Sequence, residues 1–147
     1  MISLAPNSQN LRVNDPVDWS AYHNFTAEEF FCPCCGEERM SEDLICALQT
    51  MREDLGAPIV ISKGGGYRCH AYEAAHGRRA GGAHPAGMAV DILACLGVAA
   101  KLMAMATDHN IKRIGVMQHG ALKNRFLHFD IADSILPSPR VWTYKRD

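Results

Sequence analysis

Residues 62–91 organise the chain, and they read SKGGGYRCHAYEAAHGRRAGGAHPAGMAVD. The three consecutive glycines permit backbone conformations and close approaches that side chains forbid. From residue 67 to residue 87 the stretch consists mostly of small residues, histidine and arginine. A loop of this length inside a compact domain is usually functional. We expect one short helical turn in it, at residues 71–75, and a strand at its end, residues 87–93.

Two residues of this stretch and one distant residue have side chains suited to zinc. His84 and Asp91 are seven residues apart, a spacing that fits a loop histidine followed by a strand aspartate. His128 lies in an alternating segment in which His128 and Asp130 share one face. A catalytic zinc commonly has three protein ligands, for which imidazole and carboxylate are suited. His84, Asp91 and His128 are therefore the candidate ligands, although a single histidine is more often a solvent or core residue.

A second cluster of metal-binding residue types occurs in the segment FFCPCCG. Cys32 and Cys35 have the CxxC spacing that lets two thiolates reach one metal ion. The chain has no second CxxC, so Cys69, and after it His70 or Cys34, are the candidates to complete a site. Three interpretations stay open: a second metal site, a disulfide to Cys69, or the buried and free thiols of a tight turn.

The remaining sequence predicts an α+β fold, with a small antiparallel sheet and helices packed on one face. A capping box of Thr26 and Glu29 predicts a short helical turn. The longer expected helices are residues 41–55 and 97–109, and the expected strands are residues 59–61, 87–93, 113–117 and 126–131. Residues 1–24 are expected to form a peripheral arm, and residues 137–147 an irregular tail whose apolar Val141 and Trp142 cover the sheet edge.

The composition is that of an ordinary globular protein. With 147 residues the chain is expected to form one domain, residues 1–147. A net charge of −1 argues against nucleic acid as a partner and against a basic membrane-binding surface. No apolar run approaches the roughly 18 residues of a membrane span, and the first ten residues lack the pattern of a signal peptide. We expect a monomer that is synthesised in the cytoplasm. In such a protein, six cysteines are expected to bind metal or to be buried, and not to form a disulfide framework.

Three motifs in this order resemble the zinc D-Ala-D-Ala carboxypeptidase family of metallopeptidases, especially its small bacteriophage and bacterial members. The motifs are GYRC at residues 66–69, HxxGxAxDI at residues 84–92 and HFD at residues 128–130. The resemblance extends from NFTAEEFFCPCCG, which starts at residue 24, to the RxW of Arg140 and Trp142. It covers most of the chain.

The resemblance implies an α+β fold shared with the Hedgehog signalling domain, and a zinc ion held by His84, Asp91 and His128. It also implies hydrolysis of peptide bonds in bacterial peptidoglycan stem peptides, by a carboxypeptidase or an endopeptidase. Arg68 matches the family arginine that contacts the substrate carbonyl or carboxylate, a role suited to its fixed guanidinium fork. Tyr67 of the same turn is a second candidate for substrate binding.

The sequence departs from the family pattern near the expected site. Gly82 and Ala83 stand where relatives commonly have serine and a polar residue, and Glu73 replaces an asparagine, so substrate contacts are expected to differ. Many relatives carry an acid three residues before the last histidine ligand, where this chain has Arg125. Asp130 is therefore the first candidate for the general base, and His119 the second.

The leading expectation is a phage or prophage lytic enzyme that acts on the cell wall, in the periplasm or outside the cell. The alternative is a catalytically weak or inactive module, stabilised by metal, with a binding or structural role such as that of a phage tail component. The substitutions at Gly82, Ala83 and Arg125 favour this alternative.

Overall fold

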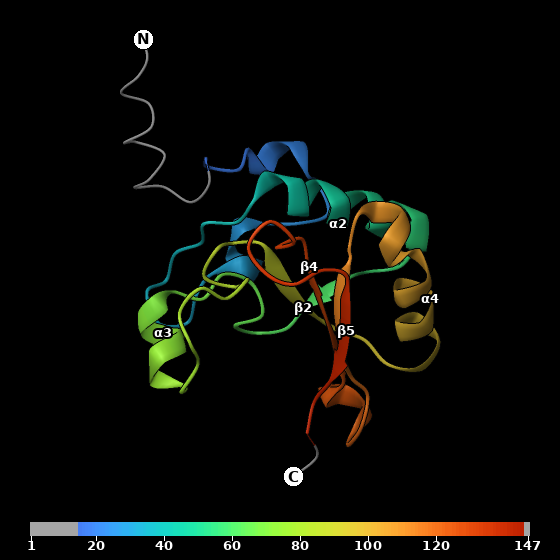
Figure 1. Ribbon diagram of the computed structural model, residues 1–147. Coiled ribbons are helices and arrows are strands. Elements are labelled where there is room, and N and C mark those ends of the chain that lie inside the picture. Colours follow the sequence, from blue (N-terminus) through green and yellow to red (C-terminus); the bar gives the residue numbers. More distant parts are fainter. Residues whose placement is uncertain (1–14, 146–147) are drawn as a thin grey trace.

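A mixed five-stranded sheet forms the centre of the computed structural model, which describes residues 15–145 (Figure 1). The strands lie in the order β1-β2-β4-β3-β5. Their bounds are β1 (Val60–Ile61), β2 (Ala89–Leu93), β3 (Arg113–Met117), β4 (Phe126–Asp130) and β5 (Arg140–Thr143). Neighbouring strands are antiparallel except β3 and β5, which are parallel.

The last strand corrects the sequence interpretation of the tail. β5 pairs with β3, placing Val141 opposite Ile114 and Trp142 opposite Gly115. The apolar pair that was expected to cover the sheet edge is thus part of the edge strand itself. A strand of four residues is too short for its alternation to be distinguished from an irregular segment. The expected antiparallel sheet is therefore mixed, while the α+β class is confirmed.

The helical elements include every expected segment and two short 3-10 turns, η1 (Trp19–Ala21) and η4 (Leu122–Asn124), that were not expected. The expected elements are η2 (Ala27–Phe30), α2 (Glu42–Leu55), α3 (His70–Ala75), α4 (Leu96–Ala106) and η3 (Thr107–His109). The backbone N–H of Thr26 donates to the Glu29 carboxylate at 2.7 Å, as a capping box requires. α2 ends at Gly56, whose φ of +68° is the left-handed conformation that glycine adopts without strain. Across residues 15–145, no helix has the length and apolar character needed to cross a membrane.

The two faces of the sheet have different environments because side chains alternate along each strand. Val90 and Ile92 of β2 and Leu127 and Phe129 of β4 are completely buried in the main hydrophobic core. The core also contains buried side chains of α2 and α4, which lie together on one side of the sheet in Figure 1. The short α3 lies apart from them, at the left of that view. The alternate residues of β2 and β4 therefore face away from the main core, and these include the residues expected to bind metal.

The glycine run is held between strand β2 and the segment that contains Phe30. Asp91 N–H donates to the Gly65 carbonyl at 2.8 Å, and Tyr67 N–H donates to the Phe30 carbonyl at 3.0 Å. A Cβ atom on Gly66 would lie 2.6 Å from Phe30 Cα and 2.9 Å from its carbonyl oxygen. Only glycine allows the two backbones to approach this closely.

We predict that Gly66→Ala lowers the free energy of unfolding by about 1–3 kcal/mol, because the added methyl group overlaps the Phe30 backbone. Urea unfolding followed by circular dichroism measures this change. Gly97→Ala in α4 is the matched control, since its Cβ would meet no atom within 4 Å. An unchanged midpoint for Gly66→Ala would contradict the close approach.

Candidate metal centre

His84, Asp91 and His128 converge on one point beside the sheet. Asp91 Oδ1 lies 3.4 Å from His84 Nε2 and 3.1 Å from His128 Nδ1. The two imidazole rings meet edge to face, with centroids 5.1 Å apart. One ligand atom from each residue lies within 4.8 Å of the other two. A single ion could therefore contact all three side chains.

Strand register and one turn produce this convergence. Asp91 of β2 is directly opposite His128 of β4, so their side chains share a face. His84 comes from the turn before β2, in which Gly87 N–H donates to the His84 carbonyl at 3.0 Å. Gly87 has a φ of +72°, a conformation that turns the chain back toward the sheet at little cost to glycine.

Each histidine is oriented through the ring nitrogen that faces away from Asp91. His84 Nδ1 lies 2.8 Å from the Gly66 carbonyl oxygen, and His128 Nε2 lies 2.6 Å from Asp130 Oδ2. Because a carbonyl oxygen only accepts, His84 Nδ1 carries the proton and Nε2 presents a lone pair. This outer hydrogen bond is the usual way in which a protein orients a histidine that binds a metal.

The electrostatics of the cluster favour a bound cation. Burial lowers the pKa of His84, so this residue is neutral near neutral pH, and its Nε2 has no hydrogen-bond partner. Burial alone would raise the pKa of Asp91, but the His84 and His128 imidazoles hold that pKa well below its usual range. His84 Nε2 and Asp91 Oδ1 lie 3.4 Å apart, and in the neutral form of His84 an imidazole lone pair faces the anionic oxygen with no hydrogen between them. Nitrogen and oxygen donors in this arrangement fit a zinc ion.

His128 has a more polar environment than His84. Burial opposes a positive charge on its ring, yet hydrogen bonds to Asp130 and Asp91 raise the pKa of His128. The Trp142 ring lies 5.1 Å from the His128 ring, centroid to centroid. Gly115, opposite His128 in β3, leaves space for this tryptophan, since a Cβ there would lie 2.8 Å from it. Trp142 of β5 therefore packs beside the cluster.

The structure does not place Asp130 on the side of His128 that faces Asp91. Asp130 is fully buried, and its Oδ2 is bonded to the opposite ring nitrogen. Its Oδ1 accepts hydrogen bonds from Arg113 Nε at 2.8 Å and from Ala132 N–H at 3.0 Å. Both oxygens are occupied, so the geometry does not favour Asp130 as the acceptor of a proton from water, which was the first expectation. Its contacts instead hold the His128 ring.

Arg113 is a residue that the sequence interpretation missed. It is 6% exposed and faces Asp130 directly across the β3–β4 pair. The available signal was an arginine and an aspartate at opposite positions of the expected hairpin, where unlike charges stabilise each other. Recognising this pair requires the register between the two strands, which the sequence alone does not show.

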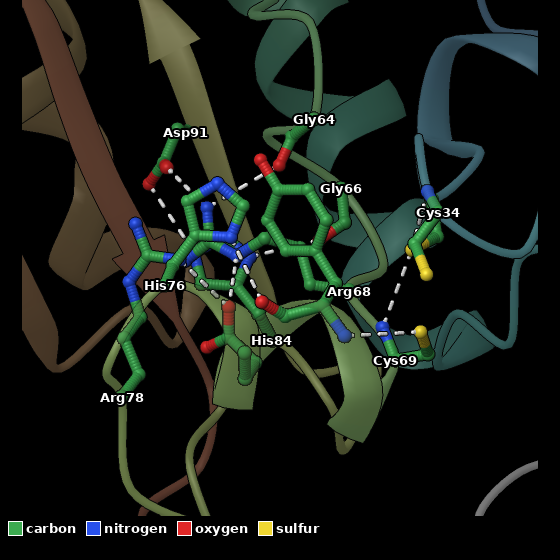
Figure 2. Close-up of polar contacts among 12 residues, drawn as sticks. Cys34, Gly64, Gly66, Arg68, Cys69, His76, Arg78, His84 and Asp91 are labelled. Carbon is green, nitrogen blue, oxygen red and sulfur yellow. Dashed lines mark hydrogen bonds and ion pairs between the residues drawn. The ribbon is translucent and has the colours of Figure 1, made fainter.

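Arg68 lies beside the cluster, as expected from its motif (Figure 2). Its Nη1 lies 3.4 Å from Asp91 Oδ2 and donates to the Gly64 carbonyl at 3.3 Å. Its Nε lies 2.9 Å from Glu73, a residue only 5% exposed that also binds Arg78 at 3.0 Å. The negative charge of Glu73, where the sequence departs from the family pattern, is therefore paired with the guanidinium groups of Arg68 and Arg78. The sequence interpretation did not identify Arg78.

Two other residues considered from the sequence are packed among apolar side chains. Tyr67 is 8% exposed and belongs to the main hydrophobic core, an environment that does not favour the predicted contact with substrate. Ala83 is buried in a small apolar cluster with Ala89 and Ala132. Gly82 beside it has space for a side chain, since a Cβ there would meet only Pro85, at 3.7 Å. Packing explains Ala83 better than altered substrate contact does.

His119 lies just after β3, in the connection to β4. Its Nε2 is buried and has no hydrogen-bond partner. The role of His119 as a general base stays a prediction.

A comparison with protein-family models matches residues 23–130 to the family described as Peptidase M15. The matched segment is more than half of the chain and includes His84, Asp91 and His128. No curated protein matches the chain. The match confirms the resemblance drawn from the three sequence motifs.

We predict that Asp130→Asn weakens zinc binding by about 10–100-fold, because the amide no longer fixes the His128 ring and leaves Arg113 without its carboxylate. Competition with a chromophoric chelator measures the affinity. Asp133→Asn, at an exposed position three residues away, is the control and should bind zinc as the unmodified protein does. Equal affinities for both variants would show that Asp130 does not position the ligand.

Proposed function

The chain belongs to the peptidase M15 family, and we propose that it is a zinc-dependent peptidase that cleaves peptide bonds in the stem peptides of bacterial peptidoglycan. The observation that carries the proposal is the convergence of His84 Nε2, Asp91 Oδ1 and His128 Nδ1 within the segment that the family model matches. Three nitrogen and oxygen ligands are the usual set for a catalytic zinc, which keeps a further position open.

A zinc ion in this position would polarise the scissile carbonyl and lower the pKa of its bound water toward about 7. Arg68 would hold the substrate beside it. Its Nε and Nη1 form ion pairs with Glu73 at 2.9 Å and with Asp91 at 3.4 Å, while Nη2 takes part in neither contact. A guanidinium held in this way presents its remaining N–H groups in a fixed direction, which suits a substrate carbonyl or carboxylate.

Asp130 acts in this proposal as a positioning residue, through its hydrogen bond to His128 Nε2. Of the two residues expected to accept the proton of the attacking water, His119 keeps a ring nitrogen without a partner. It is therefore the remaining candidate for that role. An imidazole nitrogen with a free lone pair can accept a proton from water when the two are within hydrogen-bond distance.

We extend the proposal to a phage or prophage lytic enzyme, because the GYRC, HxxGxAxDI and HFD motifs resemble small bacteriophage members of the family. Such an enzyme would act where mature peptidoglycan lies, in the periplasm or outside the cell. Cleavage at the end of the stem peptide would make it a carboxypeptidase, and cleavage within the stem or a cross-link an endopeptidase.

One observation favours the second candidate function, a metal-stabilised binding or structural module with weak or no hydrolysis. Asp130, the acid nearest His128 in sequence, has both carboxylate oxygens occupied on the far side of that ring. A module of this kind would keep the metal and the fold while releasing no product.

Incubation of the zinc-loaded protein with purified sacculi tests the two candidates. We predict release of soluble peptides or amino acids, detected by liquid chromatography and mass spectrometry, and loss of that release with a chelator or with His84→Ala. His23→Ala, at an exposed histidine outside the cluster, is the control and should remain active. Free D-alanine would identify a carboxypeptidase, and opened cross-links an endopeptidase. Muropeptides that remain intact after long incubation would contradict the peptidase and support the module.

We predict that Arg68→Lys lowers kcat/KM by roughly 10–100-fold, since a charged hydrogen bond contributes about 1.5–3 kcal/mol and lysine lacks the guanidinium fork. Steady-state kinetics on a purified stem peptide measures this change. Arg79→Lys is the control, because Arg79 is exposed. Equal kcat/KM for the two variants would exclude Arg68 as a substrate contact.

A further inference from the structure

We propose that Cys32, Cys35 and Cys69 bind a second zinc ion, with a structural role, at a site separate from the His84, Asp91 and His128 cluster. This inference does not depend on the proposed peptidase activity. It rests on the positions of the three sulfur atoms, on the hydrogen bonds they receive and on the part of the fold that they join.

The three thiols form a compact group although they come from distant parts of the chain. Their sulfur atoms lie within 4.8 Å of one another. Cys32 is 1% exposed, Cys69 is partly buried, and all three are free thiols. In a tetrahedral zinc site with bonds of about 2.3 Å, neighbouring sulfurs lie about 4 Å apart, so small shifts would complete the coordination.

The local backbone presents Cys32 and Cys35 together. Gly36 N–H donates to the Cys32 carbonyl at 2.8 Å, and Cys32 N–H donates to the Glu37 carbonyl at 2.8 Å. Gly36 has a φ of +73°, which allows this tight turn. The CxxC spacing thus becomes a turn in which two sulfurs reach the same point.

Hydrogen bonds show that the environment of Cys32 Sγ is prepared for a negative charge. The backbone N–H groups of Cys34 and Cys69 both point at this sulfur, each at 3.4 Å. Two N–H donors stabilise a thiolate, which is the form that binds metal, better than a neutral thiol. The second donor comes from a segment 37 residues away, so the fold itself directs it to this sulfur.

A metal ion accounts for this group better than a disulfide does. A disulfide would join two of the sulfurs, leave the third beside it without a role, and direct two N–H donors at a neutral sulfur. Three thiolates repel one another unless a cation lies between them, and zinc favours sulfur ligands. Each thiol would release its proton on binding. A fourth ligand would complete the tetrahedron, and the exposed thiol of Cys34, adjacent to Cys35 in the chain, is available for that role.

The proposed ion would join two segments on which the first metal centre depends. Cys69 directly follows Arg68 and caps the N-terminus of α3, and its sulfur accepts a hydrogen bond from Tyr72 N–H at 3.4 Å. Cys32 lies two residues after Phe30, whose backbone packs against Gly66. The Gly66 carbonyl in turn orients His84. In Figure 2 the Cys34 and Cys69 side chains lie at one end of this arrangement and Asp91 lies at the other, with Arg68 between them. An ion bound by the cysteines would therefore fix the loop that carries Arg68 and supports His84.

Zinc analysis of the full-length chain by plasma mass spectrometry tests the proposal. We expect about two zinc ions per chain, and about one for the double variant Cys32→Ser, Cys35→Ser. Cys46→Ser is the matched control, because Cys46 is exposed on α2, and it should keep two. The double variant His84→Ala, His128→Ala removes the first centre only and should keep one ion.

Substitution with cobalt identifies the ligands without any measurement of activity. Thiolate-to-cobalt charge-transfer absorption should be present in the unmodified protein and in the histidine double variant, and absent from the cysteine double variant. The histidine variant decides the matter if the cysteine variant does not fold. A histidine variant that binds no metal and shows no thiolate absorption would overturn the proposal. So would a disulfide between any two of the three cysteines in the protein purified without reductant.

Discussion

The loops and strands around the site are arranged about the space between His84 Nε2, Asp91 Oδ1 and His128 Nδ1. A carboxylate oxygen and at least one imidazole lone pair point toward this space. Groups of this kind repel one another unless a cation lies between them, and burial strengthens the repulsion because water does not screen it. Other features hold the three atoms in place. The β2–β4 register sets Asp91 against His128, and the Gly66 carbonyl and Asp130 bind the outer nitrogens of the two rings.

Basic and acidic side chains alternate across the sheet and into the loop around this space. The series runs in order through Arg113, Asp130, His128, Asp91, Arg68, Glu73 and Arg78. Most of its members are buried, and a buried charge that loses its partner costs several kcal/mol. The position of each side chain in the series is thus constrained by its contacts with the neighbouring members. This explains why a buried acid is tolerated at position 73, and why Asp130 lies behind His128 instead of facing water.

Local patterns predicted much of the fold, and together with the resemblance to the peptidase family they selected the three side chains that converge. Alternation in β4 placed His128 and Asp130 on one face, and the signals at Ser41 and Gly56 delimited α2. Contacts that depend on the pairing of distant segments could not be predicted from the sequence. The parallel position of β5 and the contact between Arg113 and Asp130 depend on register, and the burial of Tyr67 depends on its packing against the core. The general base could not be assigned from spacing, because spacing does not show which ring nitrogen of His128 the Asp130 carboxylate contacts.

A crystal structure of the protein grown with zinc, with anomalous diffraction recorded on both sides of the zinc absorption edge, would show whether one ion joins the three side chains. We predict an anomalous peak bounded by His84 Nε2, Asp91 Oδ1 and His128 Nδ1, each about 2.0–2.2 Å from the ion, with Asp130 on the far side of the His128 ring. Absence of a peak at this position, or an ion that Asp130 binds in place of Asp91, would contradict this prediction.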